Sequence, residues 1–130
     1  MSRLLHSGQV IVDLVMSLDT LPATGGDVLA NSASFEAGGG FNVMAAARRN
    51  GLPVVYLGRY GNGRFGDLAR AAMQAEGIEM ALAASDDKDT GLCVSLTEAT
   101  TERTFISHIG AEGDLLAQDL ANAVPRDDSP

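Results

Sequence analysis

A run of three glycines directly before a helix pattern contains residue types suited to ligand binding. Gly38, Gly39 and Gly40 precede a helix predicted over residues 41–50, and Asn42 lies at its start. Successive glycines let a backbone approach a ligand closely, and the first N–H groups of a helix are free to donate. No Lys-Ser or Lys-Thr pair follows, which excludes a Walker A phosphate loop. Asn42 offers both a donor and an acceptor, which suits hydroxyl-rich ligands. The alternative is purely structural, with glycines that shape a turn and Asn42 as a helix cap.

A second glycine segment, residues 61–66, matches the dinucleotide-binding pattern G-x-G-x-x-G. It follows a predicted strand and opens a predicted helix, and Asp86 lies about twenty residues further on, as a ribose-binding acid should. Arg59 and Tyr60, however, separate the end of the strand from the first glycine, whereas the fingerprint turns directly off the strand. The alternative is a glycine-rich helix entry without a ligand. The glycines that would contact a pyrophosphate are Gly61, Gly63 and Gly66.

The elements that must position these segments follow from hydrophobic periodicity and from glycine and proline breaks. We expect strands over 4–13, 28–35 and 54–57, helices over 41–50 and 64–76, a hairpin of 92–96 with 103–106, and a short helix near Asp114. The first strand ends on Asp13. Strand, helix, strand and helix in that order favour βαβ units, so the predicted fold class is α/β with a mostly parallel sheet and flanking helices.

Composition limits the function classes. The chain has 130 residues, 45% of them hydrophobic and 20% charged, which is typical of one folded domain. The formal net charge is −8 and the one adjacent basic pair is Arg48 with Arg49, which argues against a nucleic-acid partner. No apolar run is long enough to cross a membrane and residues 1–8 do not resemble a signal peptide, so we expect a cytoplasmic protein. Cys93 is a single cysteine, predicted to be buried in a strand, and no spacing of ligands suggests a metal site.

Taken together, these segments resemble the first signature of the ribokinase-like (PfkB) carbohydrate kinases. The residues 8–13 are similar to the opening strand of that family, and Leu21-Pro22 with Gly25-Gly26-Asp27 is similar to the loop that follows it. The resemblance covers residues 4 to about 120. The signature itself is carried by Ala37 to Asn42, Ala45 to Ala47, Gly51, Gly58 and Gly61 to Gly66.

The resemblance implies a ribokinase-like fold and a small-molecule acceptor, either a sugar or a nucleoside, phosphorylated with ATP and Mg²⁺. By this resemblance Asp13 accepts hydrogen bonds from sugar hydroxyls, Gly38 and Gly39 bring backbone against the sugar, and Asn42 reads another hydroxyl. Ribokinases proper carry Lys after the glycine pair where this chain has Gly39 and Gly40, so ribose itself is not favoured. Arg103, at the start of a hairpin strand near the expected sugar site, could contact an acidic or phosphorylated substrate.

The resemblance also implies a small β-sheet lid over residues 14–17 and 28–35, which in this family often pairs between subunits, so a homodimer is expected. The catalytic Asp of the family lies in a downstream Gly-Ala-Gly-Asp motif that has no counterpart here. We therefore expect residues 1–130 to be the N-terminal part of one ribokinase-like domain, without a catalytic residue or nucleotide pocket, and inactive alone. The alternatives are a non-catalytic sugar-binding or regulatory fragment and, in third place, an NAD-binding Rossmann protein.

Overall fold

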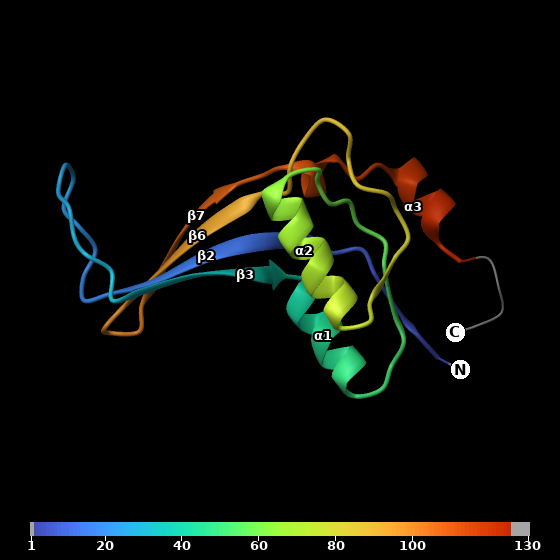
Figure 1. Ribbon diagram of the computed structural model, residues 1–130, viewed down its shortest axis with the longest axis horizontal. Coiled ribbons are helices and arrows are strands. Elements are labelled where there is room, and N and C mark those ends of the chain that lie inside the picture. The colour runs from blue at the N-terminus through green and yellow to red at the C-terminus, as the bar shows by residue number, and fades with distance from the viewer. Residues whose placement is uncertain (1, 126–130) are drawn as a thin grey trace.

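The computed structural model describes residues 2–125, which form two β-sheets and three α-helices. Figure 1 shows the helices gathered at one end of the molecule, and the sheet of β2, β3, β6 and β7 extending away from them as a long arm. The elements are β1 (Leu4–His6), β2 (Val10–Leu18), β3 (Ser32–Gly39), α1 (Phe41–Arg49), β4 (Val54–Tyr56), α2 (Arg64–Ala75), β5 (Glu79–Met80), β6 (Leu92–Glu98), β7 (Arg103–His108), a 3-10 turn (Ala111–Asp114) and α3 (Ala117–Ala123).

The first sheet is parallel and has the strand order β1-β4-β5. Its short strands are linked by α1 and α2, so the predicted βαβ arrangement and the α/β fold class are confirmed. The buried face of this sheet packs against both helices. Met44 from α1 and Met73 from α2 are fully buried there, together with Tyr56 from β4. β1 and β4 are only three residues long, and the buried core of this part is completed by Met44, Ala69 and Met73 from the helices.

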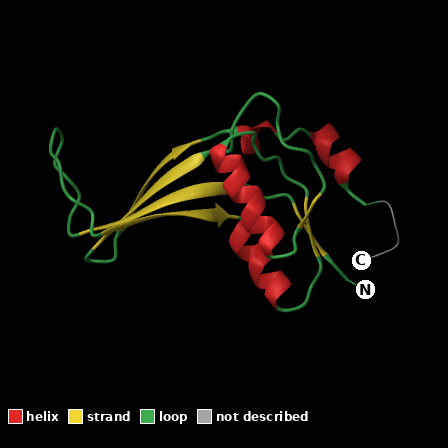
Figure 2. Ribbon diagram, viewed as in Figure 1, coloured by secondary structure: helices red, strands yellow, loops and turns green. Residues whose placement is uncertain are grey.

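The second sheet forms the arm and has the strand order β3-β2-β6-β7. Here β2 pairs antiparallel with β3 and parallel with β6, and the hairpin of β6 and β7 closes the other side. Figure 2 shows these four strands running side by side from the helices to the loops at the tip. The hairpin is where the periodicity predicts it. The sequence does not predict that the hairpin belongs to the same sheet as residues 14–17, which the structure shows.

Two predicted strand boundaries differ from the structure. The run over 4–13 is broken between β1 and β2, and β2 continues to Leu18, so Asp13 lies in the middle of a strand and not at its end. The strand expected over 28–35 is β3, at Ser32–Gly39. Residues 28–31 lie outside the sheet, in the loop at the tip, where Leu29 is 90% exposed. At the other end β3 includes Gly38 and Gly39 because their backbone still pairs with β2.

The basic pair at the end of α1 has a structural role. Arg48 donates from Nε to the backbone oxygen of Glu76, at 3.1 Å, and Arg49 forms an ion pair with the Glu76 carboxylate. These contacts join the C-terminal ends of α1 and α2. Both guanidinium groups contact Glu76 at the C-terminal end of α2. They therefore do not form the basic face that a nucleic acid requires. No helix in the described range is both long and apolar enough to cross a lipid bilayer.

Tyr56 connects the parallel sheet to the arm. Its side chain is fully buried, and its hydroxyl accepts a hydrogen bond from the Val10 N–H at 3.2 Å and donates to the Arg59 backbone oxygen at 3.3 Å. Burial raises the pKa of Tyr56 to about 12, so the hydroxyl remains protonated and able to donate. The first residue of β2 is therefore held by the middle of the parallel sheet.

Replacing Tyr56 with Phe should lower the free energy of unfolding by about 1–2 kcal/mol, because the buried Val10 N–H loses its acceptor. Chemical denaturation measures the change. Tyr60→Phe is the matched control, since Tyr60 is also buried but its hydroxyl has no hydrogen-bond partner within residues 2–125. Equal stability changes for the two variants would show that the hydroxyl of Tyr56 does not hold β2.

Candidate functional site

Asp13 and Gly38, which the sequence predicts to act together, are in contact. In the antiparallel pairing of β2 with β3, Ile11 is opposite Gly38 and Asp13 is opposite Glu36. A Cβ atom on Gly38 would overlap Oδ2 of Asp13, so the carboxylate occupies the space that any other side chain at position 38 would fill. The missing side chain leaves room for the carboxylate against the buried Gly38, one residue before the exposed Gly39.

The next two glycines make the turn from β3 into α1. Gly39 has a φ of +64°, and Gly40 donates its N–H to the Gln9 backbone oxygen at 2.6 Å. Gly40 is also the N-cap of α1, where no side chain supplies a capping hydrogen bond. His6, on β1, packs its ring where a Cβ of Gly8 or Gly40 would lie.

Asn42 lies in the first turn of α1, exposed, one turn from the glycines. The alternative of Asn42 as the helix cap is wrong, because Gly40 occupies that position. The first N–H groups of α1 have no partner within the helix and no capping side chain, so they point outward beside Asn42 as free donors. The structure thus places Asp13, Gly38, Gly39 and Asn42 around one junction of the arm with α1.

The pairing register gives the arm two different faces. Residues opposite one another across the four strands share a face, and alternate residues of each strand point to opposite faces. One face, called the Asp13 face, is mostly polar. The other, called the Phe35 face, is mostly apolar. The Asp13 face consists of Ile11, Asp13, Val15, Ser17, Ser32, Ser34, Glu36, Gly38, Cys93, Ser95, Thr97, Arg103, Phe105 and Ser107. The Phe35 face consists of Val10, Val12, Leu14, Met16, Leu18, Ala33, Phe35, Ala37, Gly39, Leu92, Val94, Leu96, Glu98, Thr104, Ile106 and His108.

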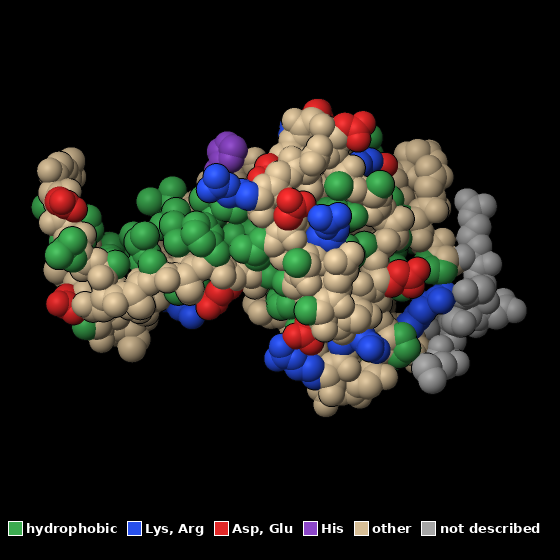
Figure 3. Space-filling model, in the orientation of Figure 1, with side chains coloured by type: hydrophobic (Ala, Val, Ile, Leu, Met, Phe, Trp, Pro, Cys, Tyr) green, Lys and Arg blue, Asp and Glu red, His purple; other side chains and the backbone are tan. Residues whose placement is uncertain are grey.

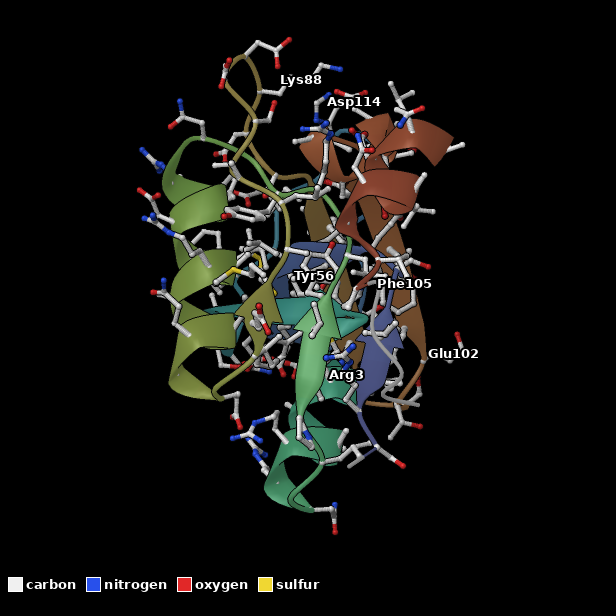
Figure 4. All side chains as sticks on the ribbon, turned by 90° about the vertical axis from the view of Figure 1, so that its right-hand side faces the viewer. Arg3, Tyr56, Lys88, Glu102, Phe105 and Asp114 are labelled. Carbon is white, nitrogen blue, oxygen red and sulfur yellow. The ribbon has the colours of Figure 1, made fainter. Side chains whose placement is uncertain are left out.

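The Asp13 face contains hairpin residues that the sequence does not connect with Asp13. Cys93 is its direct neighbour on β6 and is buried, as predicted, and Ser107 donates to the Cys93 sulfur at 3.4 Å. Phe105 is 56% exposed and lies on the side of the molecule away from α1 and α2 (Figure 4). The alternation of side chains along the hairpin strands predicts that these residues share one face. Only the pairing of β2 with β6 shows that Asp13 lies on the same face.

The surroundings of Asp13 disfavour its negative charge. Burial raises the pKa of this carboxyl group, the neighbouring charge of Glu36 raises it further, and the positive charge of Arg103 lowers it. Burial is the largest of these effects. The ionised Asp13 side chain therefore lowers the stability of the folded protein. A carboxylate that destabilises the fold in this way is typical of a binding position.

The dinucleotide pattern at residues 61–66 does not form a ligand site. The Asp89 carboxylate accepts hydrogen bonds from the N–H groups of Phe65, at 3.1 Å, and Gly66, at 2.7 Å, so it occupies the position a pyrophosphate would take. Cβ atoms at Gly61 and Gly63 would overlap Asp89 or its neighbour, and one at Gly66 would overlap the backbone of Gly61. The three glycines are needed for this packing, and Asp89 caps α2, a role that the sequence pattern does not indicate.

A cleft of about 680 Å³ lies away from Asp13. Leu92 and His108 line it from the Phe35 face, Phe65 lines it from the start of α2, and Lys88 and Asp89 close one side. Lys88 pairs with Asp114 at 2.8 Å, and the two side chains meet at the top of Figure 4. Among residues 2–125 no group of three or more His, Cys, Asp or Glu side chains is arranged to hold a metal ion. None of the site residues predicted from the sequence lines this cleft, so the Asp13 face remains the candidate site for binding hydroxyl groups.

Asp13→Asn should stabilise the protein at neutral pH, and the gain should shrink as the pH falls. A carboxyl group whose pKa is higher in the folded than in the unfolded state destabilises the fold when ionised. This destabilisation is absent at a pH below the pKa of Asp13 in the unfolded state, and it reaches its full size above the pKa of Asp13 in the folded state. Urea denaturation of both proteins from pH 7 down to pH 4 measures it. Asp67→Asn, on the exposed surface of α2, controls for removal of one charge. An Asp13→Asn variant no more stable than the wild type at pH 7 would contradict this prediction.

Comparison with known proteins agrees with the fold. Residues 1–127 match the model of the pfkB family carbohydrate kinases. An uncharacterized sugar kinase of Escherichia coli K12, YegV, is 30% identical over 115 residues, which are 88% of this chain and 36% of the relative. Among solved structures, ribokinase from Cryptococcus neoformans var. grubii serotype A, in complex with ADP, is 28% identical with a TM-score of 0.74, over 85% of this chain and 34% of that one.

Arabidopsis thaliana ribokinase, complexed with ribose and ATP, has a similar fold with a TM-score of 0.66 at 23% identity, over 85% of this chain and 37% of that one. The chain spans about a third of the length of each of these proteins. The family match covers nearly all of the 130 residues and includes the glycine junction, Asp13 and the arm. The chain belongs to the pfkB family of carbohydrate kinases.

Proposed function

We propose that this chain forms the acceptor-binding part of a kinase that phosphorylates a hydroxyl group of a sugar or nucleoside. The observation that carries the proposal is the contact of the Asp13 carboxylate with Gly38 beside the uncapped start of α1. It brings acceptors and donors of hydrogen bonds together next to bare backbone. A polyhydroxy compound needs both kinds of partner, because each hydroxyl donates once and accepts as well.

Each residue has a separate task in this proposal. Asp13 accepts hydrogen bonds from one or two hydroxyls, and such charge-assisted bonds are stronger than neutral ones. Gly38 makes room for the Asp13 carboxylate, and the exposed Gly39 brings the backbone close to the ring of the acceptor. Asn42 and the free N–H groups of α1 donate to acceptor oxygens. These groups bind and orient the acceptor, which favours phosphoryl transfer through positioning.

We infer that the nucleotide and its metal ion bind outside residues 2–125. In support, Asp89 fills the start of α2, and these residues contain no cluster of metal ligands. In such a kinase ATP supplies the phosphoryl group and Mg²⁺ neutralises the charge of its phosphates. Since the related ribokinases were solved with ADP or with ribose and ATP, we assign the nucleotide, the metal and the catalytic base to the part of the relatives that this chain does not span.

The test is a kinase assay on the protein expressed from its gene to the natural stop codon. ADP release with Mg²⁺ and ATP is measured over a panel of sugars, sugar acids and nucleosides. Asp13→Ala should lower kcat/KM by about tenfold to a hundredfold, mainly through KM, because a hydrogen bond to a charged group is lost. Glu102→Gln, at the turn of the hairpin in Figure 4, should leave it unchanged. Binding of a panel member without ADP release would favour a non-catalytic sugar-binding protein, and an unaffected Asp13→Ala enzyme would refute the site.

We also propose that the Phe35 face of the arm pairs with the same face of a second copy. Most of its side chains are apolar, and Phe35 and Ile106 are 51% and 64% exposed. Glu98, opposite Leu18 near the tip, is its one acidic residue in the pairing register. Figure 3 shows hydrophobic side chains gathered over the arm on this side. A two-fold interface places a patch against its own copy, and the apolar centre of this patch permits that contact without repulsion.

Light scattering after size-exclusion chromatography should show a dimer for the wild type. Ile106→Glu should convert it to a monomer, because a carboxylate would be buried without a partner. Leu29→Glu, in the tip loop and 90% exposed, should remain dimeric. A wild-type monomer at all concentrations, or a dimer in the Ile106→Glu variant, would contradict the pairing.

A further inference from the structure

The Asp13 face carries a single basic residue, Arg103, among the residues that the pairing register assigns to it. Arg103 is opposite Thr97 on β6, and Thr97 is opposite Ser17 on β2. Ser17 is four residues beyond Asp13 on the same strand, and so shares its face. At about 3.3 Å per residue, the two rows are about 13 Å apart along the arm.

The Arg103 side chain is not engaged by the fold. It is exposed, and its guanidinium makes no ion pair or hydrogen bond with any other residue in the described range 2–125. Three other arginines, Arg49, Arg59 and Arg70, each pair with a carboxylate, whereas Arg64 is exposed and unpaired within the same range, like Arg103, but lies on α2. Yet the Arg103 guanidinium is close enough to Asp13 for its charge to lower the pKa of that carboxyl group. It therefore faces the same space as Asp13.

The charges on this face are separated along the arm. Asp13 and Glu36 are directly opposite one another near α1, whereas Arg103 is nearer the tip. Phe105 lies between these positions, opposite Ser95, and exposes an aromatic surface. A ligand that matches this order has hydroxyl groups at one end, carbon-bound hydrogens in the middle and a negative charge at the other end.

We propose that the acceptor is an anionic sugar, a polyhydroxy compound with a carboxylate or phosphate group, whose hydroxyls bind at Asp13 and whose anionic group binds Arg103. The inference rests on the proposed function and names its substrate class. A guanidinium presents parallel N–H donors that match the two oxygens of a carboxylate or phosphate. The carboxylates at the other end disfavour the reversed orientation of such a ligand.

Calorimetric titration of the protein expressed to its natural stop codon tests this proposal. The probes are D-gluconate and D-ribose 5-phosphate, compared with the neutral parents D-glucose and D-ribose. One anionic probe should bind about tenfold or more tightly than its parent, as expected for one charge-assisted contact in a partly exposed site. Whether gluconate or the sugar phosphate shows the larger preference distinguishes a carboxylate from a phosphate ligand.

Variants identify the residue responsible. Arg103→Gln should abolish the preference for the anionic probe and leave the affinity for the neutral parent unchanged, and Arg103→Lys should keep part of the preference. Arg64→Gln, an exposed arginine at the start of α2, is the matched control and should behave as the wild type. Since the Arg103 side chain is exposed and unpaired in the described range, its replacement leaves the core intact.

The outcomes separate the two levels of the proposal. Equal binding of charged and neutral probes, or a preference that survives Arg103→Gln, would overturn the anionic assignment while the acceptor site at Asp13 stands. Failure of every probe and of every compound in the kinase panel to bind would contradict the proposed function, and the anionic assignment with it.

Discussion

The antiparallel pairing of β2 with β3 is the constraint on which the site depends. It places the Asp13 carboxylate where Gly38 has no side chain, and the same pairing delivers Gly39 and Gly40 to the start of α1. Because side chains alternate along a strand, a shift of one residue would move Asp13 to the apolar Phe35 face. The position of one carboxylate, the use of glycine at three successive positions and the direction of α1 are thus consequences of a single register.

The parts of the fold that depend on local sequence could be predicted closely. The helices expected over 41–50 and 64–76 are Phe41–Arg49 and Arg64–Ala75, and the buried strand expected over 54–57 is Val54–Tyr56. Helical periodicity and the glycines at the helix ends determine these boundaries within a few residues of each position. The glycine junction with Asp13 and Asn42 could also be predicted from the sequence, because its residues follow one another in a recognisable order.

What depends on contacts between distant residues could not be predicted. The β6–β7 hairpin reads clearly in the sequence, but nothing local indicates that it pairs with β2 and so brings Cys93, Phe105 and Arg103 to the face of Asp13. Likewise, Asp89 is part of an acidic stretch in the sequence, whereas in the fold it caps α2 through the N–H of Phe65, 24 residues earlier. That tertiary contact turns a dinucleotide-like glycine pattern into a packing motif.

The turn at Gly39 and Gly40 also joins two mechanical elements. β3, which belongs to the arm, runs through these two residues directly into α1, which belongs to the helical part (Figure 1). Asp13 moves with the arm and Asn42 moves with the helix. A rotation about the backbone of these two glycines would change the distance between Asp13 and Asn42, so the tilt of the arm sets the width of the proposed acceptor site.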